Sequence, residues 1–240
     1  MEDSRARDRE VVEAVVEGHG FHLVYQPIVH LDTGDVAGVE ALCRFDDGAP
    51  TEHRFRMCEE LGLAAPLDLA IVETALADFP HLPGGYLALN LSASTVCDRS
   101  LQALFEAADV PGSRLVIEIT EHARIPDYQQ AAAVIEALRA RGIRLAVDDA
   151  GAGWASFRHI LSLRPDIIKM DRSLTRGVDV DPARRAVSES TSWVSERSIL
   201  MMSGRRLRMW RKLAQPAPAS STARRTPFLR SASITDDACL

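Results

Sequence analysis

Apolar and polar positions follow two different periods along the first 170 residues of the chain. Short apolar runs rich in Val, Ile, Leu and Tyr predict six strands, at residues 21–29, 36–45, 86–91, 115–119, 144–147 and 167–170. Apolar residues spaced three or four positions apart predict helices at residues 8–17, 67–79, 101–108, 128–141 and 155–163. Strands that alternate with helices of this length are typical of βαβ units, so the pattern predicts an α/β fold with a parallel sheet.

The character of the chain changes near Val187. Residues 1–187 carry 19 Lys and Arg against 30 Asp and Glu, a net charge of −11, whereas residues 188–240 carry 9 against 4, a net charge of +5. The last 53 residues hold 10 serines and show no sustained alternation, so no strand is predicted there. Residues 198–213 are compatible with a basic helix, and the sequence from Gln215 onward is typical of disorder. An ordinary flexible tail and a shift of reading frame both account for this change.

Bulk composition excludes several classes of protein. The chain has 240 residues, of which 46% are hydrophobic, and this is enough for one large domain with a sizeable core. Its net charge of −6 argues against nucleic-acid binding, and the short basic stretch at residues 205–212 is more typical of a solvated helix than of a membrane or nucleic-acid contact. The four cysteines lack paired spacing, which favours reduced thiols. The absence of a signal peptide and of a long apolar stretch predicts a cytoplasmic protein without a membrane span.

Several polar residues stand inside or at the end of the apolar strands. They are Glu40, Asn90, Glu118, Asp148, Asp149, Lys169 and Asp171. In an α/β barrel, functional groups gather at the carboxyl ends of the strands. Acidic side chains in apolar strands are costly unless they are paired or bind a cation, and a ring of oxygen ligands suits Mg²⁺ or Mn²⁺. Taken singly, Glu40 and Glu118 also fit half-exposed strands, and the Asp148-Asp149 pair also fits a helix N-cap.

Lys169 is the only lysine among the first 187 residues, which contain 18 arginines. The chain therefore uses arginine at nearly every basic position but places its one lysine inside an apolar strand. A compact ammonium group holds a carboxylate or a water molecule in a way that a planar guanidinium does less well. The position predicts that Lys169 has such a partner.

Six ordered motifs resemble the EAL family of bacterial cyclic-di-GMP phosphodiesterases. They are Tyr25-Gln-Pro-Ile-Val29, Val39-Glu-Ala-Leu42 with Arg44, Asn90-Leu-Ser-Ala93, Glu118-Ile-Thr-Glu121, Asp148-Asp-Ala-Gly-Ala-Gly153 and Lys169-Met-Asp171. The resemblance extends over about residues 10–187. It implies a TIM-like (β/α)₈ barrel with one antiparallel strand, which hydrolyses cyclic di-GMP to linear pGpG with Mg²⁺ or Mn²⁺. It also implies a possible homodimer.

The resemblance further implies roles for single residues. The ligands of a first metal ion would be Glu40, Asn90, Glu118 and Asp148, and Asp149 would bind a second ion. Lys169 would orient or activate the attacking water, so the catalytic group would be Lys169, Asp149 and Glu40. Glu121 would stabilise the loop after Asp149. The substrate cleft would be lined by Gln26, Arg44 and Asp171.

The chain departs from the family after Lys169. The family's E-G-V-E motif on the seventh strand and its Q-G motif near the eighth are both missing. The sequence therefore predicts an N-terminal helix at residues 1–20, an incomplete EAL domain at residues 21–187 and a basic, disordered tail at residues 188–240. Two functions stay open: an active phosphodiesterase, or a degenerate, inactive member that binds nucleotide or is a truncated product. An unrelated metal-dependent barrel is the remaining alternative.

Overall fold

A computed structural model describes residues 12–17, 19–30, 33–120, 125, 127–150, 162–170, 180–182, 199–203 and 230–233. The strands among these residues form a closed barrel in sequence order. They are β1 (Phe21–His30), β2 (Val36–Phe45), β3 (Tyr86–Leu91), β4 (Leu115–Thr120), β5 (Arg144–Ala150), β6 (Ile167–Met170), β7 (Ile199–Ser203) and β8 (Arg230–Ser233). β1 runs antiparallel to both of its neighbours, β2 and β8, and the other pairs are parallel. The predicted α/β fold with one antiparallel strand is confirmed.

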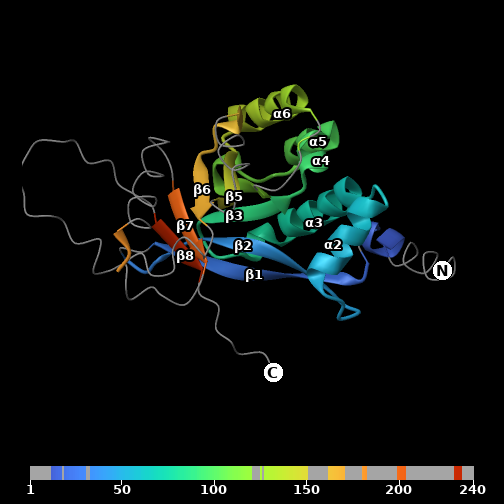
Figure 1. Ribbon diagram of the computed structural model, residues 1–240, viewed down its shortest axis with the longest axis horizontal. Helices are drawn as coiled ribbons and strands as arrows, with labels where there is room; N and C mark the ends of the chain where they lie inside the picture. Colours follow the sequence, from blue (N-terminus) through green and yellow to red (C-terminus); the bar gives the residue numbers. More distant parts are fainter. Residues whose placement is uncertain are drawn as a thin grey trace, which may run out of the picture.

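The last two strands differ from the expectation for the tail. The sequence predicts a basic helix over residues 198–213 and disorder from Gln215, but β7 lies in the first segment and β8 in the second. β7 pairs with β6, and β8 pairs with β7 and with β1, so the described strands close a barrel that was expected to be incomplete (Figure 1). The open edges of β6 and β1 supply backbone hydrogen-bond partners for these strands, and the closed barrel then leaves no strand edge unpaired. The predicted domain boundaries at residues 20 and 187 stay predictions.

Helices lie on the outer face of the barrel and contact β1, β2, β3 and β5 (Figure 1). They are α2 (Thr51–Glu60), α3 (Ala64–Asp78), α4 (Ala93–Val96), α5 (Arg99–Ala107) and α6 (Tyr128–Ala140), with short 3₁₀ turns at Phe79–His81 and Gly112–Arg114. The predicted helices at residues 67–79, 101–108 and 128–141 correspond to α3, α5 and α6, whereas α2 and the short α4 lie outside the predicted helices. Residues 12–16 are helical as expected, and most of the predicted helix at residues 155–163 lies outside the described residues. None of the described helices is long and apolar enough to cross a membrane.

The two faces of each strand have different environments, as the two-residue period of a strand requires. Outward-facing side chains such as Leu89 and Ile117 are about 1% exposed and belong to the main core with the helices. Inward-facing apolar residues form a separate cluster inside the barrel, made of Ile28, Tyr86, Ala88, Val116, Ala146 and Ile167. The lumen is therefore filled at this level. Two residues further along the parallel strands, the inward positions become polar.

Candidate functional site

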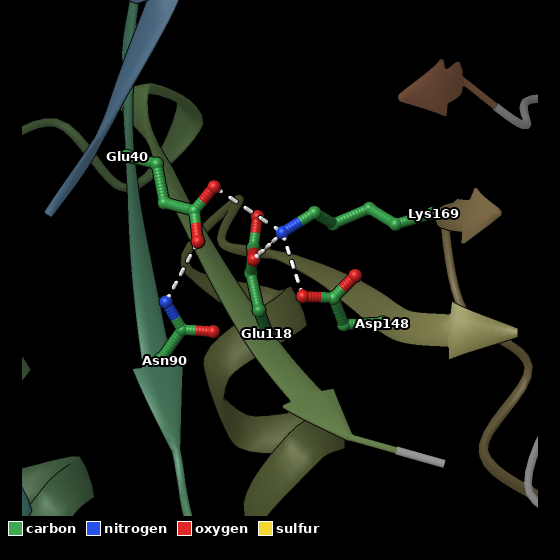
Figure 2. Close-up of polar contacts among 5 residues, drawn as sticks. All are labelled: Glu40, Asn90, Glu118, Asp148 and Lys169. Atoms are coloured by element: carbon green, nitrogen blue, oxygen red, sulfur yellow. Dashed lines mark hydrogen bonds and ion pairs between the residues drawn. The ribbon is translucent and has the colours of Figure 1, made fainter. Parts of the chain in front are cut away.

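Five strands each place one polar side chain in the layer above the apolar lumen cluster. Glu40 lies on β2, Asn90 on β3, Glu118 on β4, Asp148 on β5 and Lys169 on β6. Four of them follow a lumen-facing apolar residue by two positions, and the parallel register pairs Asn90 with Glu118. The five side chains consequently point toward one another, as Figure 2 shows. The structure brings these five of the predicted site residues together, and their predicted roles stay predictions.

The Lys169 ammonium group contacts all three carboxylates of the site (Figure 2). Its Nζ donates hydrogen bonds to Glu40 Oε2 at 3.3 Å and to Asp148 Oδ2 at 2.8 Å, and also to Glu118 Oε2. Asn90 Nδ2 donates to Glu40 Oε1 at 2.9 Å. The Lys169 side chain is only 10% exposed, and that of Glu118 is fully buried. Lys169 therefore has the carboxylate partners that its position in an apolar strand predicted.

Burial and crowding of like charges control the protonation of this cluster. Burial raises the pKa of Glu118 to about 8; Lys169 opposes the shift, and Glu40 and Asp148 add to it. For Lys169, burial acts to lower the pKa, but the nearby carboxylates outweigh burial and raise it. The lysine thus stays charged at neutral pH. Three carboxylates surround this one ammonium group, so acidic side chains outnumber the cationic side chain in the cluster.

The residues present fit a divalent cation. Glu40, Glu118 and Asp148 offer carboxylate oxygens that all lie within 4.8 Å of one another. Glu118 Oε1 is buried and has no hydrogen-bond partner, which is costly for a polar atom unless a further group binds it. Hard cations such as Mg²⁺ and Mn²⁺ prefer such oxygen ligands. Glu40, Asn90, Glu118 and Asp148 could hold the ion, which would give the Glu118 oxygen a partner and offset the negative charge.

The remaining predicted site residues have different places. Gln26 is half-buried on β1 and lies opposite Glu40 in the antiparallel register. Arg44 is exposed near the end of β2, where its Nη1 donates to the carbonyl oxygen of Cys43 at 2.8 Å. Asp149 belongs to β5, next to Asp148. Glu121 and Asp171 lie outside the described residues, so their predicted roles stay predictions.

One buried acid close to the site was missed by sequence reasoning. Asp68 lies on α3, is 2% exposed and contacts the residues that follow β3. The signal was present in the sequence, because Asp68 shares a helical face with Val72 and Ala75, which are fully buried. An acid on the apolar face of a helix indicates a specific partner.

The perturbed pKa of Glu118 predicts a pH dependence for the metal-free chain. In the presence of a chelator, we expect the urea midpoint of unfolding to fall as the pH rises from about 5 to about 8. The folded chain binds the Glu118 proton more tightly than the unfolded chain does, because the pKa rises from 4.5 to about 8 on folding. This contribution to stability is fully present below the pKa of Glu118 in the unfolded chain, and it is lost as the pH rises through the pKa in the folded chain. Glu118→Gln should flatten the profile, and identical profiles for the two proteins would contradict the assignment.

Comparison with known proteins identifies related sequences and structures. The family pattern described as EAL domain matches residues 8–197. The uncharacterized protein Rv1357c of Mycobacterium tuberculosis is 31% identical over 183 residues, which cover 70% of this chain and 60% of that protein. Cyclic di-GMP phosphodiesterase PA2567 of Pseudomonas aeruginosa is 32% identical over 191 residues, which cover 74% of this chain and 32% of that protein. The chain therefore spans less than two thirds of the length of either relative.

A solved structure with the same fold was determined with ligands bound. BlrP1 of Klebsiella pneumoniae, in a complex with manganese and cyclic di-GMP, is 26% identical and has a TM-score of 0.69. The similarity covers 82% of this chain and 52% of that chain.

Proposed function

The chain belongs to the EAL domain family, and we propose that it is a metal-dependent phosphodiesterase that hydrolyses cyclic di-GMP to linear pGpG. The observation that carries the proposal is the convergence of Glu40, Glu118 and Asp148 on the Lys169 ammonium group, with one buried glutamate oxygen left unbonded. A structural ion pair needs one carboxylate for one ammonium group. Two further carboxylates at the same point fit a cation site better than they fit a role in stability.

Each residue of the cluster has a distinct part in the proposed reaction. Glu40, Asn90, Glu118 and Asp148 hold Mg²⁺ or Mn²⁺, which when bound supplies a Lewis acid and lowers the pKa of a water molecule. Lys169 carries three N–H donors and no acceptor, so it orients the attacking water by donating to its oxygen. The water oxygen bonds to phosphorus as the bond from phosphorus to O3′ breaks. The water gives up one proton and O3′ takes up one proton, so the net products are a 5′-phosphate and a free 3′-hydroxyl group.

The substrate would lie across the mouth of the barrel above this cluster. Gln26 lies beside Glu40 on the β1–β2 hairpin, and Arg44 stands four residues further along β2 on the same face. An exposed guanidinium is suited to contact a phosphate or a guanine edge. We further propose that Asp149 binds a second ion and that Glu121 stabilises the loop after Asp149. Asp171 would line the substrate cleft.

A second function, binding of cyclic di-GMP without turnover, is favoured by the amino-acid sequences of β7 and β8. In the parallel register, Lys169 pairs with Met201. Neither β7, with the sequence Ile-Leu-Met-Met-Ser, nor β8, with Arg-Ser-Ala-Ser, contributes a carboxylate. A site with fewer acidic ligands would hold metal ions more weakly, and hydrolysis would suffer before nucleotide binding does.

Incubation of the full chain with cyclic di-GMP and Mn²⁺, followed by chromatography, distinguishes these functions. We expect pGpG to form with Mn²⁺, to be absent with a chelator, and to disappear in Glu40→Ala because that change removes an ion ligand. Glu73→Ala, which changes an exposed glutamate on α3, serves as the matched control and should keep the activity. Calorimetric binding of cyclic di-GMP without pGpG would establish the second function. A chain that neither binds cyclic di-GMP nor forms pGpG would contradict both functions.

A further inference from the structure

Asp68 forms a buried connection between α3 and the segment that leaves β3. One of its oxygens, Oδ2, accepts a hydrogen bond from the backbone N–H of Ser92 at 2.7 Å and from Thr95 Oγ1 at 2.5 Å. Thr95 is fully buried, and its hydroxyl group also lies 2.8 Å from Ser92 Oγ. The carboxylate therefore holds both ends of a four-residue segment, which carries the first turn of α4.

This segment begins two residues after Asn90. Leu91, which separates Asn90 from Ser92, is 4% exposed and packs in the main core. With Leu91 fixed on one side of the strand and Ser92 bonded to Asp68, the backbone at the end of β3 has little freedom. The side chain of Asn90 is then aimed into the lumen, where its Nδ2 reaches Glu40 Oε1 at 2.9 Å. The Asp68–Ser92 hydrogen bond, the backbone from Ser92 to Asn90 and the Asn90–Glu40 hydrogen bond thus connect Asp68 to the candidate cation site.

We propose that Asp68 is a positioning residue for the metal site, which fixes the end of β3 so that the Asn90 side chain meets Glu40 and the cation. The inference rests on the proposed function, since it concerns the same ion. Outer partners of metal ligands orient those ligands, and their loss typically weakens metal affinity or activity by about 10–100-fold. Asp68 touches neither substrate nor ion, so it acts only through Asn90.

The chemistry of the contact supports a role beyond packing. Burying a carboxyl group is unfavourable, and burial raises the pKa of Asp68 while the bonds from Thr95 and Ser92 oppose the rise. A neutral apolar residue on this face of α3 would avoid that cost, as Leu67 and Val72 do. The backbone N–H of Ser92, which is the N-cap of the short helix α4, needs an acceptor, but a carboxylate that also bonds Thr95 fixes the segment at two points.

The test measures Mn²⁺ affinity of the full chain by calorimetry in four variants. Asp68→Leu removes both acceptor oxygens at similar side-chain size, and we expect its Kd for Mn²⁺ to rise about 10-fold or more. Thr95→Val removes only the hydroxyl group and should weaken binding by a smaller factor, whereas Thr95→Ser keeps the hydroxyl group and should restore wild-type affinity. Thr74→Val is the matched control, because the Thr74 hydroxyl group donates to the Ala70 carbonyl oxygen within α3.

A second readout follows Asn90 without any metal. The side-chain NH₂ resonances of Asn90, assigned by their loss in Asn90→Ser, should shift in Asp68→Leu and in Thr95→Val but not in Thr74→Val. A purely structural role would lower the melting temperature but leave both the Asn90 resonances and the Mn²⁺ affinity unchanged, and that result overturns the inference. Absence of Mn²⁺ binding in the unaltered chain would instead contradict the proposed function, and unshifted Asn90 resonances would still decide the role of Asp68.

Discussion

Replacing Lys169 by methionine is expected to lower the free energy of unfolding of the metal-free chain by about 3–5 kcal/mol at neutral pH, because removal of one partner leaves buried charges uncompensated. Lys169 is the common hydrogen-bond donor to Glu40, Glu118 and Asp148. The same substitution should reduce turnover of cyclic di-GMP by about 10²–10⁴-fold, since the attacking water loses its positioned donor.

Denaturant unfolding in a chelator and again with Mn²⁺ measures the Lys169 effect. Mn²⁺ should stabilise Lys169→Met more than it stabilises the unaltered chain, because the ion replaces the missing positive charge. Lys169→Arg is the informative control: it keeps the charge and should recover part of the stability, but its larger planar group should not recover turnover. Equal stability of Lys169→Met and the unaltered chain in the chelator would contradict the proposed electrostatics.

Ending the chain after residue 197 is expected to abolish cooperative folding. This truncation removes β7 and β8, so β6 loses one of its two parallel partners and β1 loses one of its two antiparallel partners. Two unpaired edges in an open sheet promote aggregation, and the lost burial is large compared with the roughly 5–15 kcal/mol that stabilises a typical domain. We expect the shortened chain to be insoluble or to melt without a sharp transition in differential scanning calorimetry.

Two further end points serve as controls for the truncation. A chain that ends after Ser233 keeps both strands and should melt as the full chain does, whereas one that ends after residue 229 loses only β8 and should be intermediate. A sharp, unchanged transition for the chain of 197 residues would show that the tail does not close the barrel. That outcome would agree with the disordered tail that the sequence alone predicts.

The first six strands were predictable because each combines an apolar run with clear boundaries. β3, for example, reads Tyr-Leu-Ala-Leu-Asn-Leu between glycines and a serine, and its predicted bounds agree with the structure. β7 has only four consecutive apolar residues beside a basic segment, and β8 reads Arg-Ser-Ala-Ser with no apolar alternation. Such strands form because neighbouring edges supply hydrogen-bond partners, and this influence of tertiary structure is not encoded in a local pattern.

The sequence indicated which residues form the candidate site but not how their side chains are arranged. Polar residues at corresponding positions of successive strands, such as Asn90 and Glu118, must meet inside a barrel, so their proximity follows from strand order. The sequence also indicated a partner for Lys169, but it did not specify that three carboxylates share one ammonium group. Asp68 escaped notice because its partners, Ser92 and Thr95, are far from it in sequence and become neighbours only when α3 packs beside β3.

Anomalous X-ray scattering from crystals grown with Mn²⁺, measured at the manganese edge, tests the central claim most directly. We expect an anomalous peak within about 2.5 Å of oxygen atoms of Glu40, Glu118 and Asp148, with the Asn90 carboxamide as a further ligand. The Lys169 ammonium group should then have given up at least one of its three carboxylate contacts. Absence of a peak among these residues, with Lys169 still bonded to all three carboxylates, would show that the cluster is a buried ion-pair network and not a metal centre.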